Sequence, residues 1–325
     1  MIAAAPKSVL ITGANSGLGL ECARQLALLN VERIVIGCRS EAKGKQAQED
    51  LKQAMAKAGK ADKSNKTKFE VLLMDLSDIA SVKKAVATLA TPVESLVMNA
   101  GGLGGGNPGN LTKNVVSMTV ATNLLGHVVL FDGLVQANKL TKSAIYAGSE
   151  AARGEWRMML PSTKVKSGSK QEFQSMCDGS FYGTKSQDLS ITYAGTKFLA
   201  ALWVGAVARA HPNLRVVTVS PGHTAGTGIF EPEGLPVVAK FLMKNLVLPL
   251  QYLFGMAQSK ETSAKRYVDV LFDSTGTTYP SGTFFASKRG LTGPIADQST
   301  YYNKVFSNQT YQDNASDAIR SFIDV

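Results

Sequence analysis

Cysteine is scarce in this sequence. Its three cysteines, Cys22, Cys38 and Cys177, are widely spaced, and no CxxC pair or histidine-rich partner pattern accompanies them. An odd number of scattered thiols predicts neither a disulfide framework nor a zinc site. We therefore expect no metal and favour a reducing compartment.

Long uninterrupted apolar runs are also missing. The start, MIAAAPKSVLITG, enters a strand pattern within a few residues and lacks a charged segment followed by a long apolar stretch, so no secretory signal is expected. The apolar tract 229–256 is interrupted by Pro236, Lys240, Lys244 and Pro249, and its runs are shorter than the roughly 20 residues of a spanning helix. We expect an intracellular protein, soluble or peripherally membrane-associated. For 229–256 a substrate lid, a membrane-surface helix and helices packed on the sheet edge all stay open.

A nucleic-acid interface is not indicated either. The net charge is +10, which suits a phosphate-bearing cofactor or an anionic membrane surface. The densest basic stretch, residues 57–68, holds five lysines and no aromatic residue. Because base-stacking side chains and a recognition motif are both absent there, we interpret it as a solvated helix end and loop.

Short β-branched runs alternate with longer helical patterns along the chain. This alternation predicts βαβ units on a central parallel sheet with helices on both faces. We expect one doubly wound α/β domain of the Rossmann type over residues 1–325, with right-handed crossovers. Residues 153–188 and 229–256 do not fit the regular alternation. The strand-like runs are 8–12, 33–37, 68–74, 95–99, 143–147 and 214–220.

The first strand-like run leads into a glycine-rich turn, TGANSGLG at residues 12–19, followed by a helical pattern. Glycines allow a tight turn and let the backbone approach a pyrophosphate, whose charge lies at the positive end of the helix. The strand before and the helix after supply the context that a lone glycine motif lacks. The residues predicted to bind a dinucleotide here are Gly13, Asn15, Ser16, Gly17, Leu18 and Gly19.

The end of the second strand indicates which dinucleotide is bound. An acidic residue at this point would bind the ribose hydroxyls of NAD, but the sequence reads Gly37-Cys38-Arg39-Ser40. A guanidinium pairs bidentately with a 2′-phosphate, which a carboxylate would repel. The prediction is NADP(H), held by Arg39 and Ser40. The alternative interpretation of Arg39 is a surface arginine at a strand end.

With these residues in place, the chain resembles the classical short-chain dehydrogenase/reductase family over most of its length. Motifs of that family follow successive strands in the expected order. The resemblance implies that Asp75 and Leu76 contact adenine, and that further cofactor contacts come from Asn99, Ala100, Gly101, Pro221, Gly222, Thr224, Tyr193 and Lys197. Thr224 is a candidate partner for the cofactor's carboxamide or phosphate.

The resemblance also implies a catalytic set of Asn123, Ser149, Tyr193 and Lys197. Hydride transfer to a carbonyl builds negative charge on oxygen, so an acid must deliver a proton, and a free tyrosine with a pKa of about 10 is poorly suited near neutral pH. Lys197, four residues after Tyr193 on the same helix face, is expected to lower that pKa. By resemblance, Lys197 also binds the nicotinamide ribose, Ser149 holds the carbonyl oxygen, and Asn123 anchors a water that links Lys197 to solvent.

Other polar residues have plainer interpretations. His127, in the apolar helix of Asn123, is interpreted as a packed structural histidine. Cys177 has no basic neighbour to activate its thiol and is expected to be inert. Glu150, beside Ser149, either influences the pocket or points to solvent.

The interval between Ser149 and Tyr193 is 44 residues, so 153–188 is expected to form an added element beside the active site. This insertion, the turn at Arg39 and the long region after Gly222 look more like the retinol dehydrogenase and light-dependent protochlorophyllide reductase branches. The predicted activity is NADPH-dependent reduction of a lipophilic aldehyde, ketone or conjugated double bond. A protochlorophyllide-type light-dependent reductase and a non-catalytic NADP(H) sensor or scaffold are the alternatives.

Overall fold

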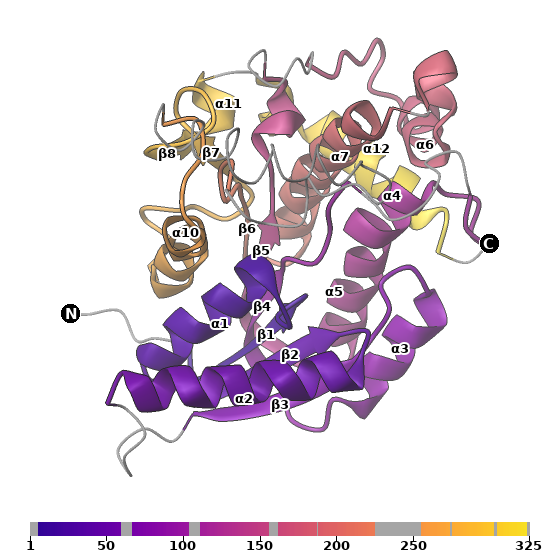
Figure 1. Ribbon diagram of the computed structural model, residues 1–325. Coiled ribbons are helices and arrows are strands. Elements are labelled where there is room, and N and C mark those ends of the chain that lie inside the picture. Colours follow the sequence, from indigo (N-terminus) through magenta and orange to yellow (C-terminus); the bar gives the residue numbers. More distant parts are fainter. Residues whose placement is uncertain are drawn as a thin grey trace, which may run out of the picture.

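The computed structural model describes residues 6–59, 67–103, 111–155, 162–186, 188–224, 255–273, 275–301 and 304–323 (Figure 1). Within these ranges the strands are β1 (Ser8–Thr12), β2 (Arg33–Cys38), β3 (Lys68–Leu73), β4 (Val93–Met98), β5 (Leu140–Ala147), β6 (Arg215–Val219), β7 (Phe284–Ser287) and β8 (Ile295–Asp297). The α-helices are α1 (Gly17–Leu28), α2 (Glu41–Lys57), α3 (Ile79–Thr88), α4 (Met118–Val120), α5 (Gly126–Gln136), α6 (Lys170–Asp178), α7 (Leu189–Ala210), α10 (Lys260–Phe272), α11 (Gln298–Tyr301) and α12 (Gln309–Arg320). Shorter turns are the π-helical η1 (Ala121–Leu125) and the 3₁₀ turns η2 (Glu150–Arg153), η4 (Ser180–Lys185) and η7 (Lys304–Ser307).

These strands form one sheet in the order β3-β2-β1-β4-β5-β6-β7-β8. Strands β1 to β7 pair in parallel, and β8 returns antiparallel to β7. The order reverses between β1 and β4, and in such sheets ligands bind outside the carboxyl ends of the strands at this reversal. The predicted doubly wound α/β fold is confirmed, and the glycine turn begins at the reversal.

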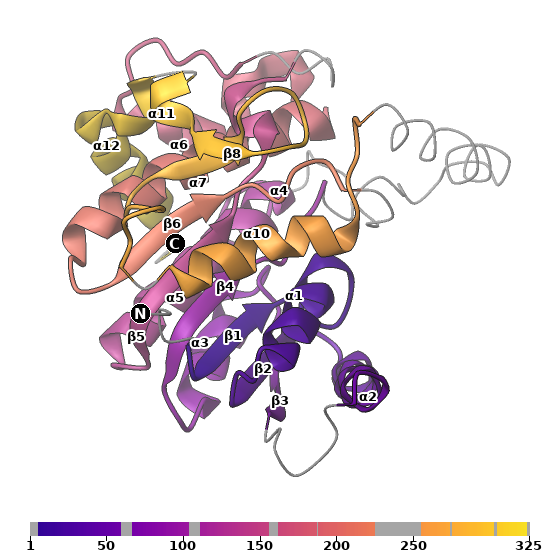
Figure 2. The ribbon, with the colours of Figure 1, turned by 90° about the vertical axis from the view of Figure 1, so that its left-hand side faces the viewer.

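The alternation of side chains along β1 explains the two covering layers. Val9 and Ile11 pack on the face covered by α1, α2 and α10, whereas Leu10 packs on the face covered by α3, α5 and α7. Figure 2 shows α1 and α10 side by side on the first of these faces. Because both faces are covered, the central strands are nearly continuous apolar runs, which makes them recognisable in the sequence.

Strands β7 and β8 were not among the predicted strands. They contain four and three residues, which is too short for a period-two pattern to stand out. Tertiary contacts hold them in place: the fully buried Gln298 donates hydrogen bonds to the carbonyls of Ala286 and Ala296, one on each strand. Strand β7 also pairs with β6 at Thr218 and Phe284, so its formation depends on a distant part of the chain.

Two helical stretches, Met118–Gln136 and Leu189–Ala210, are long and apolar enough to cross a membrane by composition alone. In this fold 72% and 89% of their most apolar windows are buried, as in core helices of globular domains. The apolar tract 229–256, for which the sequence left three alternatives, lies outside the described residues except for its last two.

The insertion at 153–188 contains α6 and η4 in its described part. Phe173 of α6 meets Tyr311 of α12 edge-on with ring centroids 6.1 Å apart, and Gln174 donates a hydrogen bond to Ser321. From η4, the Tyr182 hydroxyl packs against Gly195 in α7, where a Cβ would clash with it. The insertion therefore lies beside the helix that carries Tyr193 and Lys197.

Candidate active site

The glycine turn is tied to the ends of β1, β2 and β4 by backbone and side-chain hydrogen bonds. Gly13 has a φ of +68°, and its N–H donates to the Gly37 carbonyl at 2.7 Å. Asn99 donates from its side chain to the Thr12 carbonyl at 3.0 Å, and the Thr12 hydroxyl accepts from the Asn99 N–H at 2.9 Å. A Cβ on Gly19 would lie 2.5 Å from the Gly13 carbonyl oxygen. Glycine is therefore required for the turn itself at this position.

The first turn of α1 is suited to a phosphate group. Gly17 has a φ of +56°, and a Cβ there would meet nothing within 4 Å, so it faces open space. Ser16 precedes the helix in an extended conformation, and its side chain makes no capping hydrogen bond. The first N–H groups of a helix have no partner inside the helix, so they are available to an anion. The cradle thus fits the pyrophosphate of a dinucleotide.

The end of β2 lies next to this turn. Arg39 is exposed, and no hydrogen bond or ion pair involves its guanidinium within the described part of the chain. Ser40 caps α2 by accepting a hydrogen bond from the Lys43 N–H at 3.3 Å. After β3, Asp75 accepts hydrogen bonds from the Ser77 backbone and hydroxyl, which fixes the turn predicted to meet adenine. Arg39 is thus free to pair with a 2′-phosphate.

The predicted catalytic side chains come together at the carboxyl end of β5. Ser149, two residues beyond β5, hydrogen-bonds the Tyr193 side chain. Lys197 donates to the Ala147 carbonyl at 2.7 Å, and its Nζ lies 5.4 Å from the Tyr193 ring centroid. Helix α7 begins at Leu189 after a capping Asp188, so Tyr193 and Lys197 occupy successive turns of one face.

The pKa of Tyr193 differs from the expectation. The tyrosine is partly buried against Ala151 and Ala194, and withdrawal of its hydroxyl from water raises its pKa to about 12, with Glu150 raising it further and the Ser149 hydrogen bond lowering it. Burial also lowers the pKa of Lys197 to about 7. The expected lowering of the Tyr193 pKa by Lys197 is therefore wrong for the protein alone, because burial destabilises the charged form of both groups.

Asn123 lies in η1 and is fully buried. Its side-chain carbonyl accepts from the Gly102 N–H at 2.9 Å, and its amide donates to the carbonyls of Gly102 and Thr119. The side chain thereby fixes the loop after β4, and a Cβ on Gly101 would clash with it. Asn123 thus holds the segment Asn99-Ala100-Gly101 against the sheet. Its backbone carbonyl has separate partners.

That carbonyl accepts hydrogen bonds from two aromatic side chains. The Tyr146 hydroxyl donates at 2.5 Å, and His127 Nδ1 lies at 3.0 Å. On its other side, His127 Nε2 lies 3.0 Å from the Thr12 hydroxyl. Burial lowers the pKa of His127 to about 3, so its imidazole is neutral. His127 is a packed core residue, as the sequence indicated.

Glu150 points inward, which decides between its two sequence interpretations. It is 3% exposed and accepts hydrogen bonds from the Ser220 hydroxyl at 2.5 Å and from the Ser287 N–H at 3.0 Å. The Arg266 guanidinium lies 3.6 Å from the carboxylate and donates to the Ser220 carbonyl at 2.9 Å.

Cys177 is fully buried in α6, and burial raises the pKa of its thiol, which agrees with the expectation that it is inert.

The segment after β6 is fixed by the same neighbourhood. Gly222 has a φ of +78°, and a Cβ there would lie 2.8 Å from the guanidinium of Arg266. The Pro221 carbonyl accepts from Gln258 at 2.6 Å. Thr224 is buried, and its hydroxyl is 2.7 Å from Ser263 and 3.1 Å from the Gly222 carbonyl. Its hydroxyl is therefore engaged within the protein.

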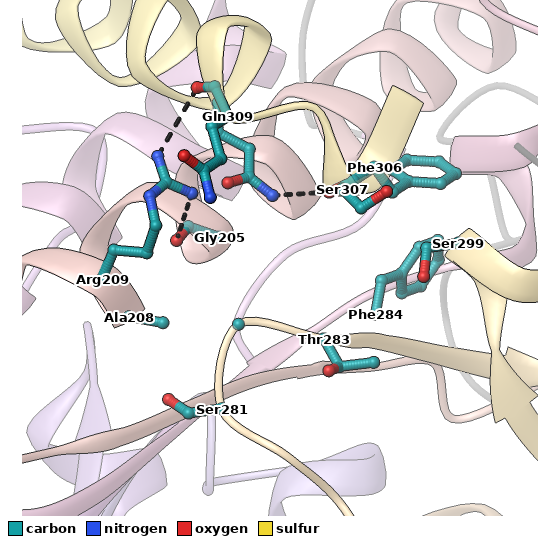
Figure 3. Close-up of a pocket in the computed structure, with 12 residues that line it drawn as sticks. Gly205, Ala208, Arg209, Ser281, Thr283, Phe284, Ser299, Phe306, Ser307 and Gln309 are labelled. Atoms are coloured by element: carbon teal, nitrogen blue, oxygen red, sulfur yellow. Dashed lines mark hydrogen bonds between the residues drawn. The ribbon is translucent and has the colours of Figure 1, made fainter. Parts of the chain in front are cut away.

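A separate cavity of about 260 Å³ lies near the end of α7 (Figure 3). Arg209, Ser281 and Phe284 are among the residues that line it, and the Arg209 guanidinium is bound to the Gly205 and Gln309 carbonyls. None of the predicted site residues lines this cavity. It does not belong to the Tyr193 site.

Comparison with known proteins finds similarity to one family. Residues 7–159 match the family model of short chain dehydrogenases. The first half of the chain is therefore similar to short chain dehydrogenases, and curated relatives with dehydrogenase and reductase names extend the likeness. The matched residues 7–159 include the glycine turn, Asn123 and Ser149, whereas Tyr193 and Lys197 lie beyond residue 159.

Two curated proteins and one solved structure illustrate the likeness to this family. Retinol dehydrogenase 14 of Mus musculus is 31% identical over 46% of this chain and 46% of its own length. Protochlorophyllide reductase B of Oryza sativa subsp. japonica is 27% identical over 86% of this chain and 69% of its own length. L-Sorbose reductase from Gluconobacter frateurii, solved with NADPH and L-sorbose, aligns with a TM-score of 0.58 and 18% identity over 86% of this chain and 94% of that one. The chain thus spans about half of the first relative and about two thirds of the second.

Proposed function

We propose that the protein is an NADP(H)-dependent oxidoreductase that reduces a lipophilic aldehyde, ketone or conjugated double bond, with Tyr193 as the proton donor. The observation that carries this proposal is the convergence of Ser149, Tyr193 and Lys197 at the carboxyl end of β5. The similarity to short chain dehydrogenases and the NADPH complex of the sorbose reductase support the cofactor. The free guanidinium of Arg39 supports the phosphorylated form.

The bound nicotinamide would supply the hydride. The Ser149 and Tyr193 hydroxyls are neighbours, so a carbonyl oxygen that displaces their mutual hydrogen bond would accept a hydrogen bond from each. Because burial keeps the Tyr193 hydroxyl protonated, it can donate a proton as charge develops on that oxygen. Lys197, held by the Ala147 carbonyl, provides a nearby group that can restore this proton.

A lipophilic substrate is favoured by the resemblance to retinol dehydrogenases and by the extra element, residues 162–186, beside α7. An intracellular location, with or without peripheral membrane contact, belongs to the same proposal. Nothing in the proposed activity requires a nucleic-acid partner.

The test is a panel of aldehydes and ketones of increasing chain length, with consumption of NADPH followed by its absorbance. Tyr193→Phe should lower kcat by about 100-fold or more, because general acid catalysis contributes that much, while NADPH binding is retained. Tyr279→Phe, in the loop before β7, is the matched control and should keep full activity. Full activity of Tyr193→Phe would overturn the assignment of the proton donor.

A second candidate function is light-dependent reduction of protochlorophyllide, favoured by the similarity to the rice enzyme over 86% of this chain. In that case Tyr193 would protonate carbon after hydride transfer. Turnover of the pigment with NADPH in light, and none in the dark, would identify this function. NADPH binding without turnover of any substrate, in light or dark, would instead support the non-catalytic sensor.

A further inference from the structure

Tyr146 occupies the space between Lys197 and Asn123. It lies in β5, and no part of it is exposed to solvent. Its hydroxyl donates to the Asn123 backbone carbonyl at 2.5 Å, and the same oxygen is 3.5 Å from Lys197 Nζ. The Lys197 Nζ also lies 4.8 Å from the centroid of the Tyr146 ring. One side chain therefore contacts both the lysine and the carbonyl.

We propose that Tyr146 is a positioning residue for Lys197: its oxygen and its ring hold the ammonium group next to Tyr193. The proposal rests on the proposed function, because it assigns a task in the same proton-transfer site. It also replaces the expected water between Asn123 and Lys197 with a side chain of the protein.

The direction of the hydrogen bonds supports this role. A tyrosine hydroxyl has one proton, and here that proton is committed to the Asn123 carbonyl. Towards Lys197 the oxygen can then only accept, which favours the charged ammonium over the neutral amine. The ring face adds a cation–π attraction, which is stronger where water is excluded. Tyr146 thus opposes the burial that disfavours the charge on Lys197.

The neighbours of Tyr146 keep it in this orientation. Its ring meets His127 edge-on at 5.8 Å and Trp203 at 6.3 Å between ring centroids. His127 is fixed in turn by the Asn123 carbonyl and the Thr12 hydroxyl. Burial raises the pKa of Tyr146 well above its usual value, so its hydroxyl stays protonated while Lys197 titrates.

Other titratable groups pack around Tyr146 and Lys197 and could also affect the charge on Lys197. Tyr193 lies on α7 itself and Glu150 comes from η2, while α6 and η4 bring Cys177 and Tyr182 against the far side of that helix. Burial raises the pKa of Cys177 and of Tyr182 above their ordinary values, so both stay neutral near pH 7. The His127 imidazole is neutral there as well.

The test measures Lys197 directly, without any substrate. The pKa of the Lys197 ε-ammonium is followed by NMR in protein with ¹³C- and ¹⁵N-labelled lysine, with the resonance assigned through Lys197→Met. Tyr146→Phe should lower this pKa by about half a unit or more, because it removes one hydrogen bond to a charged group. An unchanged pKa would overturn the proposal.

The matched control is Tyr267→Phe. Tyr267 is also fully buried, but its hydroxyl has no hydrogen-bond partner in the described part of the protein. The control should leave the Lys197 pKa unchanged, and an equal shift in both variants would count against a specific role of Tyr146. If Tyr146→Phe does not fold, the wild-type spectrum decides: a slowly exchanging Tyr146 hydroxyl proton with a cross-peak to the Lys197 ε-methylene is expected, and its absence overturns the proposal.

Activity supplies a second readout that separates this inference from the proposed function. For carbonyl reduction, kcat/KM should fall about fivefold in Tyr146→Phe, the equivalent of about 1 kcal/mol, and its alkaline limb should move to lower pH by the NMR shift. NADPH affinity should not change. Absence of turnover in the wild type would refute the function but leave the titration intact, whereas wild-type turnover with an unshifted Lys197 would refute only the role of Tyr146.

Discussion

Glu150 accepts a hydrogen bond of 2.5 Å from the hydroxyl of Ser220, which joins the residue after Ser149 to the end of β6. The same carboxylate reaches β7 through Ser287. The buried Glu150 carboxylate therefore connects the ends of β5, β6 and β7, and the Arg266 guanidinium is its countercharge. Ser149 is positioned by this connection as well as by its own strand.

Glu150→Ala should destabilise the protein by about 3 to 5 kcal/mol, because it leaves the guanidinium of Arg266 buried without its partner. Urea unfolding followed by circular dichroism measures the loss. Glu49→Ala removes a carboxylate from an exposed pair with Lys52 and should cost about 0.5 kcal/mol or less. Equal effects of the two substitutions would contradict a structural role for Glu150.

Arg39→Asp should weaken NADPH binding by about 10- to 100-fold and move the preference toward NADH, since a charge-assisted hydrogen bond contributes about 1.5 to 3 kcal/mol. Calorimetric titration with both cofactors measures the change. Lys57→Asp alters the net charge equally at the other end of α2 and should affect neither affinity. An unchanged ratio of NADPH to NADH affinity in Arg39→Asp would show that Arg39 is only a surface residue.

Gly17→Ala and Gly19→Ala should separate ligand binding from folding. At Gly17 the new methyl group enters open space, so the free energy of unfolding should fall by only about 1 kcal/mol, the cost of the left-handed backbone. The same methyl group would occupy space next to the bound pyrophosphate, so NADPH affinity should fall about tenfold or more. At Gly19 the methyl group meets the Gly13 carbonyl, so stability should fall by about 2 kcal/mol or more. Thermal unfolding and NADPH titration of both variants distinguish the two effects. Undiminished NADPH affinity in Gly17→Ala would show that the pyrophosphate does not bind at this turn.

Stability should depend on pH through Lys197. Its pKa is lowered from 10.5 to about 7, so between these values the unfolded chain binds more protons than the folded one, and stability rises with pH by up to about 1.4 kcal/mol per unit. Above pH 10 the raised pKa of Tyr193 acts in the opposite direction, and stability falls as pH approaches about 12. Comparing urea unfolding of wild type and Lys197→Met at pH 7, 8 and 9 isolates the lysine contribution, with Lys52→Met as an exposed control. A constant difference across this range would contradict the lowered pKa.

The parts of the fold that local patterns encode were predictable. The runs 8–12 and 33–37 are buried on both faces, so their apolar character is continuous, and the glycine turn follows at a fixed distance. Strand β7 was not predictable, because its place is set by Glu150, Arg153 and Gln298 from other elements.

The same distinction holds within the candidate site. Tyr193 and Lys197 share one helix, so their spacing of four residues shows in the sequence. Tyr146 and Lys197 are 51 residues apart, and no short motif relates them. The direction of the Tyr193 pKa could not be predicted either, since it depends on burial that only the packed structure provides.

The π-helical turn η1 sets which way Asn123 and His127 face. A regular helix advances about 100° per residue, and a π turn absorbs one extra residue without ending the helix. Deleting one residue from 121–125 would leave a regular α-helix with its two flanking segments still in register, but it would change the placement of the residues inside the turn, so the Asn123 carbonyl could no longer meet both the Tyr146 hydroxyl and His127 Nδ1. The π turn before α5 thereby affects the alignment of a proton-transfer site whose Tyr193 and Lys197 lie on α7. Insertions and deletions within 121–125 should be tolerated far less well than side-chain substitutions there.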